Sequence, residues 1–478
     1  MDVPALRSAL VAADFTHDGV VERMGPLAAA ALGRNETTPA RQRTSEGSPL
    51  DTLVRLFLLQ TPVTRDAADA ALPGLVDPLV AQGLLVGSGG EVRALLDCRP
   101  YAADDRDLWV CSDLTPGLDG TPHAVDADHV LGISPASTSL AQLTLREPVK
   151  SALDLGTGCG VQALHLAGHA HRVVATDVNR RALRLATLTC ALNEIDQVEL
   201  CEGSLWEPVA DERFDLVTTN PPFVISPPGA DVLVYRDSGL PGDEVVERVV
   251  RGAPDHLVPG GWCQVLANWA VLRDRAWDER LGEWIAEDCS ALVVQREVLD
   301  PAEYVELWLR DAGQHGAPDY VERYDRWLWW LHDQGVEGIG FGWLSLRATP
   351  GARTFLDWPY AVEQPISWAV AAWAAYGGHQ AGPEERLVMR EDVVQETSGR
   401  AGAEDPETIV LRQQRGLRRA RAVDTVEAAV VGACDGELTT GQILAAVASL
   451  LERDADELLA AYLPILGELV REGYLTPR

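Results

Sequence analysis

Short apolar segments alternate with helix-like segments through the centre of the chain, from about residue 128 to 347, and this alternation strongly constrains the fold. Strand-like runs separated by helical stretches are typical of βαβ units, whose strands lie mainly parallel in one doubly wound sheet. Ligands of such sheets bind at the carboxyl ends of the strands. The expected strands are SALDLG, RVVATDV, QVELCEG, FDLVTTN and GWCQVLANW.

The first of these strands ends at Asp154 and runs directly into a glycine-rich turn, GTGCG. Gly156, Gly158 and Gly160 allow a tight turn and let the backbone approach a ligand closely, beside the start of a helix. Thr157 lies within the same turn. The segment therefore predicts a cofactor-binding loop at the tip of the first strand.

The second strand ends in an acidic residue, Asp177, about twenty residues after the glycines, and a carboxylate there can bind both hydroxyls of a ribose. Nicotinamide dinucleotides and S-adenosylmethionine both fit this arrangement. Asp154 favours S-adenosylmethionine, because a carboxylate attracts its ammonium group but would repel a pyrophosphate. Val178 and Asn179, which follow Asp177, are predicted to line the same site.

The third strand is followed by Ser204 and Leu205. At this position in the sheet we expect the Ser204 hydroxyl and the Leu205 backbone N–H beside the adenine ring of the cofactor. The alternative for Ser204 is an ordinary loop serine.

The fourth strand ends in Asn220, followed by Pro221, Pro222 and Phe223. The prolines have no backbone N–H, so this corner presents carbonyl oxygens with few competing donors. Together with the side-chain oxygen of Asn220, it suits an amino group, whose two hydrogens would be held so that the nitrogen lone pair faces the methyl group of the cofactor. Phe223 can stack on a flat group such as an amide or a purine. A simple turn is the alternative.

Together, DLGTGCG, ATDVN and TTNPPF resemble the motifs of class I S-adenosylmethionine-dependent methyltransferases of the (N/D)PP(Y/F) type, over about residues 128–350. That group includes release-factor glutamine, ribosomal guanine-N2 and adenine-N6 methyltransferases. The resemblance implies a Rossmann-like sheet of seven strands with an antiparallel last strand, and 336–347 is the candidate for the final hairpin. Residues 129–144 resemble the lid segment before the core, in which Ser137 and Thr138 would touch the cofactor.

The same resemblance implies roles for individual residues. Asp154, Gly156 and Gly158 would belong to the cofactor turn, and Asp177 would bind the ribose. Asn220 through Phe223 would hold the target amine. The predicted cofactor-binding residues are Asp154, Gly156, Thr157, Gly158, Gly160, Asp177, Val178, Asn179, Ser204, Leu205 and Asn220, and the predicted catalytic residues are Asn220, Pro221, Pro222 and Phe223.

Departures from the family pattern leave the methyl acceptor open. Release-factor glutamine methyltransferases usually carry Tyr where this chain has Phe223, and ribosomal guanine enzymes commonly carry a second, degenerate domain. The expected enzyme is an N-methyltransferase that acts on a planar conjugated nitrogen of a protein or peptide amide, a nucleobase or a small-molecule amine. The sequence leaves two alternatives to this enzyme. The first is a winged-helix regulatory protein that senses a ligand through the cofactor fold, and the motif from Asn220 through Phe223 disfavours it. The second is a nicotinamide-dependent oxidoreductase, which Asp154 and the Asn-Pro-Pro corner disfavour.

The N-terminal domain, expected over residues 1–127, is predicted to be mainly helical and winged-helix-like. Helices are followed by a two-stranded ribbon that turns at Gly87–Gly90, which is the winged-helix order. The polar segment 34–49 is predicted to be a loop. Because neither helix of the helix–turn–helix pair is rich in Lys or Arg, packing or partner docking is favoured over DNA binding.

The methyltransferase domain is expected over 128–350, and a C-terminal extension over 351–478. Within the extension, about residues 420–478 predict a second winged-helix-like module of three helices and a short strand, with Thr439 or Thr440 capping the middle helix. The charged segment 389–408 is predicted to be solvated surface and linker.

Composition bears on partners and location. The 478-residue chain has a formal net charge of −32 and eight scattered cysteines without a CxxC pair, so neither a disulfide framework nor a metal site is expected. It has no apolar run of the roughly 18–20 residues that a membrane span needs, and no signal peptide is recognisable, so a cytoplasmic location is expected. The negative charge makes a protein, peptide or small-molecule acceptor at least as plausible as RNA.

Overall fold

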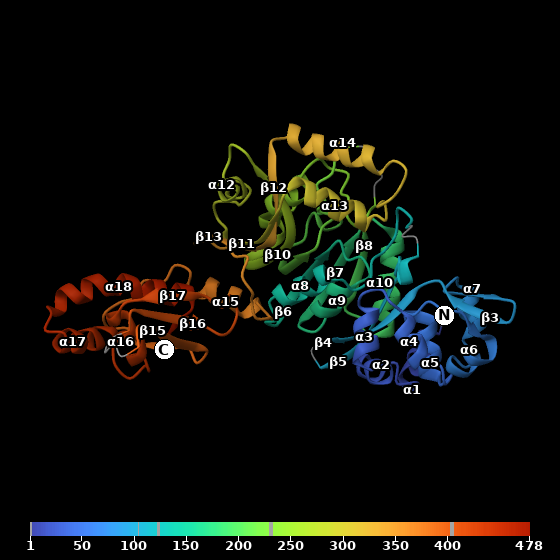
Figure 1. Ribbon diagram of the computed structural model, residues 1–478, viewed down its shortest axis with the longest axis horizontal. Helices are drawn as coiled ribbons and strands as arrows, with labels where there is room; N and C mark the ends of the chain where they lie inside the picture. The colour runs from blue at the N-terminus through green and yellow to red at the C-terminus, as the bar shows by residue number, and fades with distance from the viewer. Residues whose placement is uncertain (1, 104, 122–124, 229–232, 402–405) are drawn as a thin grey trace. The chain divides into compact units, whose positions relative to one another are not determined.

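The computed structural model describes residues 2–103, 105–121, 125–228, 233–401 and 406–478 (Figure 1). The chain forms two compact units. The expected boundaries after residues 127 and 350 stay predictions. The first unit comprises Met1–Ala141, Glu147–Ala286 and Glu297–Ala348, and the second comprises Gln142–Arg146, Glu287–Arg296 and Thr349–Arg478.

The alternating segments of the first unit form the predicted α/β core. Its strands lie in the order β12-β10-β9-β6-β7-β8, with every pair parallel except β10 and β12, which are antiparallel. The Rossmann-like class expected from the sequence is confirmed. The strands are β6 (Val149–Leu155), β7 (Ala170–Asp177), β8 (Val198–Glu202), β9 (Phe214–Thr219), β10 (Leu257–Leu272) and β12 (Val336–Arg347).

Two details of the sheet differ from the expectation. The segment 336–347 is one long strand, β12, and not a hairpin, because it pairs with β10 along most of its length. The sheet has eight strands where the resemblance implied seven. The additional strand, β13 (Arg353–Asp357), contains the β-prone run Thr-Phe-Leu and pairs parallel with β11 (Ser290–Leu299).

The register places the ends of the parallel strands at one edge of the sheet. Leu155, the last residue of β6, lies opposite Thr176 of β7 and Thr219 of β9. The turns that follow these strands therefore begin side by side. The helices and 3-10 turns around the core are α8 (Pro135–Leu143), α9 (Val161–Leu166), α10 (Arg180–Leu192), η3 (Glu207–Val209), α11 (Glu244–Gly252), η4 (Ala253–His256), α12 (Trp277–Gly282), α13 (Pro301–Asp311) and α14 (Tyr320–Asp333).

The N-terminal part of the first unit is mainly helical and carries the expected ribbon between β2 and β3, to which β1 adds a third strand. The segment 34–49, predicted as a loop, contains the short helix α4, which begins with Thr38-Pro39. The elements are α1 (Val3–Ala12), α2 (His17–Met24), α3 (Pro26–Leu32), α4 (Thr38–Arg43), α5 (Pro49–Leu53), η1 (Val54–Leu58), β1 (Val63–Thr64), α6 (Arg65–Ala71), α7 (Val76–Ala81), β2 (Leu85–Ser88), β3 (Glu91–Ala94), β4 (Asp97–Ala103), β5 (Arg106–Ser112) and η2 (Leu118–Gly120).

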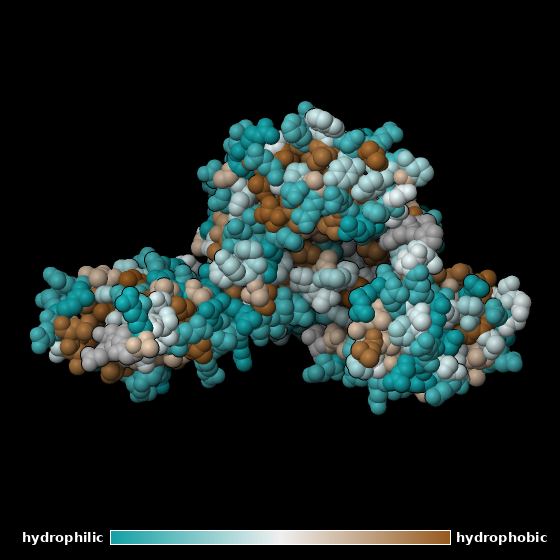
Figure 2. All heavy atoms as spheres, in the orientation of Figure 1, coloured by the Kyte–Doolittle hydropathy of each residue, from teal (hydrophilic) through white to brown (hydrophobic). Residues whose placement is uncertain are grey.

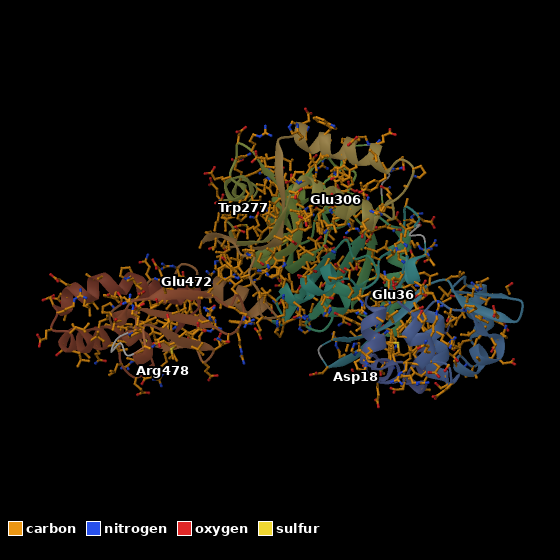
Figure 3. All side chains as sticks on the ribbon, viewed as in Figure 1. Asp18, Glu36, Trp277, Glu306, Glu472 and Arg478 are labelled. Carbon is orange, nitrogen blue, oxygen red and sulfur yellow. The ribbon has the colours of Figure 1, made fainter. Side chains whose placement is uncertain are left out.

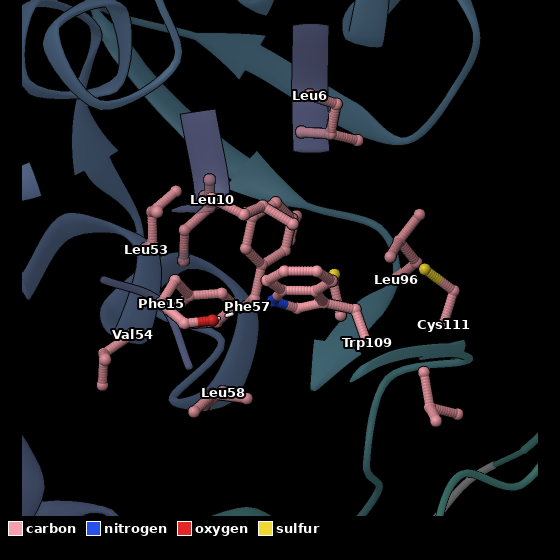
Figure 4. Close-up of a cluster of buried hydrophobic side chains, with 14 of the residues drawn as sticks. Leu6, Leu10, Phe15, Leu53, Val54, Phe57, Leu58, Leu96, Trp109 and Cys111 are labelled. Carbon is pink, nitrogen blue, oxygen red and sulfur yellow. Dashed lines mark hydrogen bonds between the residues drawn. The ribbon is translucent and has the colours of Figure 1, made fainter. Parts of the chain in front are cut away.

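Aromatic packing joins these helices to β5. Trp109 of β5 is 2% exposed, and its indole N–H donates to the backbone oxygen of Phe15 at 2.8 Å (Figure 4). Phe15 and Phe57 pack with ring centroids 6.2 Å apart. A buried indole whose N–H is satisfied supplies a large apolar area without an unpaired donor.

The second unit ends with the predicted three helices and short strand, and β18 pairs with β14. The segment 389–408 is not only linker, because it contains β15 (Val393–Ser398), which pairs antiparallel with β16 (Thr408–Gln413). Hydrophilic side chains cover much of the face drawn in Figure 2, as the net charge of −32 requires. The remaining elements are α15 (Ser367–Tyr376), β14 (Leu387–Met389), β15 (Val393–Ser398), β16 (Thr408–Gln413), β17 (Ala420–Val423), α16 (Thr425–Ala433), α17 (Thr440–Leu450), α18 (Ala455–Glu472) and β18 (Leu475–Pro477).

Candidate functional site

A cavity of about 420 Å³ lies where the turns after β6, β7, β8 and β9 meet. Most of the site residues predicted from the sequence line it, although Gly160 and Phe223 do not. A cavity of this size at the carboxyl ends of parallel strands is where a doubly wound sheet binds its ligands. The predicted residues in its walls are Asp154, Gly156, Thr157, Gly158, Asp177, Val178, Asn179, Ser204, Leu205, Asn220, Pro221 and Pro222.

The glycine turn presents bare backbone to this cavity. Gly156 and Gly158 have φ angles of 79° and 56°, and a Cβ built on either would meet nothing within 4 Å. The N–H groups of Gly156 and Thr157 donate to the carbonyl of Thr176 at 2.9 and 2.8 Å, which fixes the turn against β7. The turn is therefore held in place from the sheet side and leaves open space on the other side for a ligand to approach closely.

Gly160 has a packing role in the structure. Its φ is 87°, and a Cβ there would lie 3.2 Å from the Cβ of Ala186 in α10. The missing side chain lets the start of α9 approach α10 closely.

Asp154 is almost fully buried beneath the turn, at 1% exposure. Its Oδ2 accepts hydrogen bonds from the Thr157 hydroxyl at 2.6 Å and from the Ala163 N–H at 3.0 Å. Burial raises the pKa of Asp154 to about 7, although these two hydrogen bonds act in the opposite direction. A cation in the cavity would favour the charged carboxylate.

Asp177 and Asn179 are held at the tip of β7. Asp177 accepts from the N–H groups of Gly158 and Asn179, at 2.9 and 2.8 Å, and burial raises its pKa. The side-chain oxygen of Asn179 accepts from the Arg181 N–H, so it caps α10, and its amide donates to the carbonyl of Asp128 at 2.7 Å. Val178 is 52% exposed. Asn179 thus fixes the shape of the site through its bonds to the protein.

Asn220 presents the polar feature that most directly suggests a ligand. Its Oδ1 is buried and has no hydrogen-bond partner among the described residues. A buried acceptor without a partner costs about 1–3 kcal/mol. Other described residues also have such atoms, but Asn220 is distinguished from them because it lines the cavity. It lies directly before Pro221 and Pro222, and all three line the cavity. This corner can therefore accept hydrogen bonds from a group that brings donors.

Phe223 follows this corner and is not among the residues that line the cavity. It forms a β-bridge with Asp237, and its ring meets Trp308 at 6.5 Å and an interplanar angle of 70°. The ring therefore packs edge-to-face on α13, and stacking of Phe223 on an acceptor stays a prediction.

Two further segments line the cavity. Residues 129–137 include His129 and Ser137, and the Ser137 carbonyl accepts from the side chain of Gln162 at 2.6 Å. The lid resemblance pointed to this segment. Residues 234–240, with Tyr235 and Asp237, were missed, and no local sequence pattern marks them. Arg248 of α11 also lines the cavity and bonds to Glu244.

The described parts of the chain lack two features, a metal-binding cluster and a membrane-spanning helix. They contain no group of three or more His, Cys, Asp or Glu side chains placed to hold a metal ion. No helix among them has the length and apolarity to cross a membrane.

These features fit S-adenosylmethionine. The residues predicted to hold it are present in the cavity wall: the open glycine backbone would leave room for its amino-acid part, Asp154 would face its ammonium group, and Asp177 would accept from its ribose hydroxyls. The unpartnered oxygen of Asn220 adds an acceptor for a second molecule that brings an amino group.

Family models match three parts of the chain: the "Methyltransferase small domain" over residues 132–285, and two domains of unknown function, DUF7059 over 12–95 and DUF7782 over 369–477. The methyltransferase match spans all the predicted site residues. The two other matches fall in the N-terminal part and in the C-terminal extension.

Curated relatives match the same central region. A ribosomal protein uL3 glutamine methyltransferase of Bradyrhizobium diazoefficiens is 36% identical over 149 residues, which cover 29% of this chain and 47% of the relative. A release factor glutamine methyltransferase of Xylella fastidiosa is 34% identical, covering 24% and 46%. A ribosomal RNA small subunit methyltransferase C of Alcanivorax borkumensis is 32% identical, covering 24% and 31%. The chain spans about half the length of these relatives or less. Residues 132–285 therefore match the methyltransferase small domain family, and the relatives over this region are named methyltransferases.

Proposed function

We propose that this chain transfers a methyl group from S-adenosylmethionine to the NH2 nitrogen of a planar conjugated group, and that the acceptor is a side-chain amide of a protein. The observation that carries the proposal is the buried, unpartnered Oδ1 of Asn220 beside two residues that have no backbone N–H. Such a corner offers only acceptors, and an NH2 group supplies two N–H donors for them.

The residues at this corner act by holding the amine. Asn220 Oδ1 accepts one hydrogen of the NH2 group, and the carbonyl of Pro221 is available for the other. With both hydrogens held, the nitrogen lone pair points away from the two oxygens and is less conjugated with the attached π-system. S-adenosylmethionine supplies an electrophilic methyl group on a sulfonium. Positioning provides most of the acceleration, and the product nitrogen can lose its proton to water after transfer.

Charge and the relatives favour a protein acceptor over RNA. The chain carries a net charge of −32, which repels a polyanion. Two of the relatives described above are named glutamine methyltransferases of proteins, and one is named an RNA methyltransferase. A glutamine amide is planar and conjugated and carries the required NH2. No finding favours the alternative of a winged-helix regulatory protein.

The test is transfer of tritiated methyl groups from S-adenosylmethionine into a lysate separated into protein, RNA and small-molecule fractions. We expect label in the protein fraction that protease releases and nuclease does not. Label in RNA would show that the acceptor is not a protein, but it would still support methyl transfer from S-adenosylmethionine. No label in any fraction, with calorimetric binding of S-adenosylmethionine no stronger than that of NAD, would overturn the proposed function.

A further inference from the structure

The two helices α13 and α14 pack against each other and against β12 as a helical hairpin (Figure 1). They enclose a buried cluster that includes Val305, Leu309 and Leu331. Ile225, two residues beyond Phe223, belongs to the same cluster. The hairpin therefore touches the chain directly after the Asn-Pro-Pro-Phe corner.

Two side chains of the hairpin hold both backbone polar groups of Ile225. The Ile225 N–H donates to the hydroxyl oxygen of Tyr304 at 2.8 Å. The Ile225 carbonyl accepts from the indole N–H of Trp327 at 2.9 Å. Tyr304 and Trp327 are 0% and 4% exposed, so both bonds are shielded from water.

The Tyr304 hydroxyl also links Ile225 to the sheet. The side-chain amide of Asn268 in β10 donates to the same oxygen at 3.3 Å. If the ring only filled space, phenylalanine would serve, because a fully buried hydroxyl costs free energy unless it makes hydrogen bonds. The Tyr304 hydroxyl is therefore explained by its hydrogen bonds with Ile225 and Asn268.

The corner before Ile225 has few other anchors. Pro221 and Pro222 cannot donate to a neighbouring strand, and the ladder of β9 ends at Thr219. After them, the Val224 N–H donates to the carbonyl of Arg236, and the guanidinium of Arg236 donates to the carbonyl of Trp308 in α13 at 2.7 Å. Thr219, directly before Asn220, holds one side of the corner, because it pairs with Leu155 and its hydroxyl donates to the Leu155 carbonyl at 2.7 Å. The other side of the corner depends on the segment after it, which is bonded to α13 and α14.

We propose that Tyr304 and Trp327 are positioning residues for the methyl acceptor: by fixing Ile225 they fix the place of Asn220 and Phe223 relative to the cofactor. This inference rests on the function proposed above. Small displacements of a group that orients a reacting atom lower the rate strongly, whereas the cofactor turn on β6 and β7 is held by separate bonds and would be unaffected.

The test compares Tyr304→Phe and Trp327→Phe with a matched control, Tyr324→Phe, in the full chain. Tyr324 lies on α14, and its hydroxyl donates only across the hairpin, to the exposed Glu306 at 3.1 Å (Glu306 is labelled in Figure 3). Each tyrosine variant loses one oxygen atom and keeps its ring. Three quantities are measured: hydrogen exchange of the peptide covering 223–228, calorimetric affinity for S-adenosylmethionine, and initial rate of methyl transfer to the protein fraction that the wild type labels.

We expect Tyr304→Phe and Trp327→Phe to speed exchange in 223–228 and to lower the transfer rate at saturating S-adenosylmethionine roughly tenfold, with affinity for it unchanged within about twofold. Tyr324→Phe should match the wild type in all three. Unchanged exchange in 223–228 would overturn the inference, as would a transfer rate per folded molecule equal to that of Tyr324→Phe. If the wild type labels no fraction and binds S-adenosylmethionine no more strongly than NAD, the proposed function fails, and unaltered exchange in the variants would separately overturn the anchoring of Ile225.

Discussion

Asp177 at the end of β7 accepts a hydrogen bond from the backbone N–H of Gly158, in the turn after β6, at 2.9 Å. Its other oxygen accepts from the Asn179 N–H at 2.8 Å. One carboxylate thus joins the tips of two neighbouring strands and also lines the cavity between them. The shape of the cofactor turn and the acceptor offered to the cofactor depend on the same side chain.

Asp177→Ala should weaken binding of S-adenosylmethionine by roughly tenfold or more, because the variant loses a charged acceptor for the ribose and the bond that fixes Gly158. Titration calorimetry measures the change. Asp215→Ala is the control, since Asp215 bonds to Ser151 near the amino ends of β9 and β6, away from the cavity. Equal affinity of Asp177→Ala and the wild type would remove the ribose assignment.

Asn220→Ala should abolish methyl transfer while S-adenosylmethionine binds within about tenfold, or about 1.4 kcal/mol, of the wild type. The reason is that the lost oxygen would serve the methyl acceptor and has no partner among the residues that the structure describes. Asn220→Asp is the matched variant, because it retains a side-chain oxygen and should keep measurable activity. The two quantities are tritium transfer and calorimetric affinity. A variant defective only in cofactor binding would contradict the role of Asn220 in holding the amine.

The sequence alone predicted which residues meet at the cavity, because the carboxyl ends of parallel strands lie at one edge of a sheet. Asp154 and Asp177 lie at the carboxyl ends of β6 and β7, Asn220 directly follows β9, and the register of β6 with β7 and β9 brings the three residues to one cavity. The prediction depended on the alternation of strands and helices, on the residues at the strand ends, on the glycine-rich turn and on the family resemblance of these motifs.

Features that depend on distant partners were missed. The edge-to-face contact of Phe223 with Trp308, and the lining by Tyr235 and Asp237, arise where 223–224 pairs with 236–237 and packs on α13. Nothing in the local sequence encodes that pairing. The strand β15 lies in a segment predicted as solvated surface and linker, because its side chains are mostly exposed and show no buried alternation. Its one charged residue, Glu396, pairs with Arg412 on β16.

Thr439→Ala should lower the local stability of α17 by about 1 kcal/mol, the usual cost of losing an N-cap. The Thr439 hydroxyl accepts from the Gln442 N–H at 3.2 Å, and the Gln442 side chain accepts from the Thr439 N–H at 3.0 Å. Hydrogen exchange of the amides in 440–450 reports the change. Thr425→Ala, in the exposed first turn of α16, is the control, and equal effects of the two variants would show that the cap contributes nothing.

Because of Asp154, the stability of the folded chain should decrease as pH rises from about 4 to about 7. Burial raises its pKa to about 7, whereas an aspartate in an unfolded chain has a pKa of about 4. Between these values the folded chain holds a proton that the unfolded chain has lost, so the contribution of this group to stability decreases as pH rises through that window and stays low above it. The penalty comes from a charged carboxylate without a cation beside it.

Binding of S-adenosylmethionine should offset the cost of burying the charged Asp154 carboxylate. An ammonium group beside Asp154 favours the charged form, so binding near pH 6 should release a proton, and the affinity should rise with pH up to about 7 and then level off. Calorimetry in two buffers of different ionisation enthalpy counts the proton. Asp154→Asn should bind without releasing it and show a flatter pH profile. Proton uptake by the wild type, or an affinity that falls as pH rises from 6 to 7, would mean that Asp154 does not face the ammonium group.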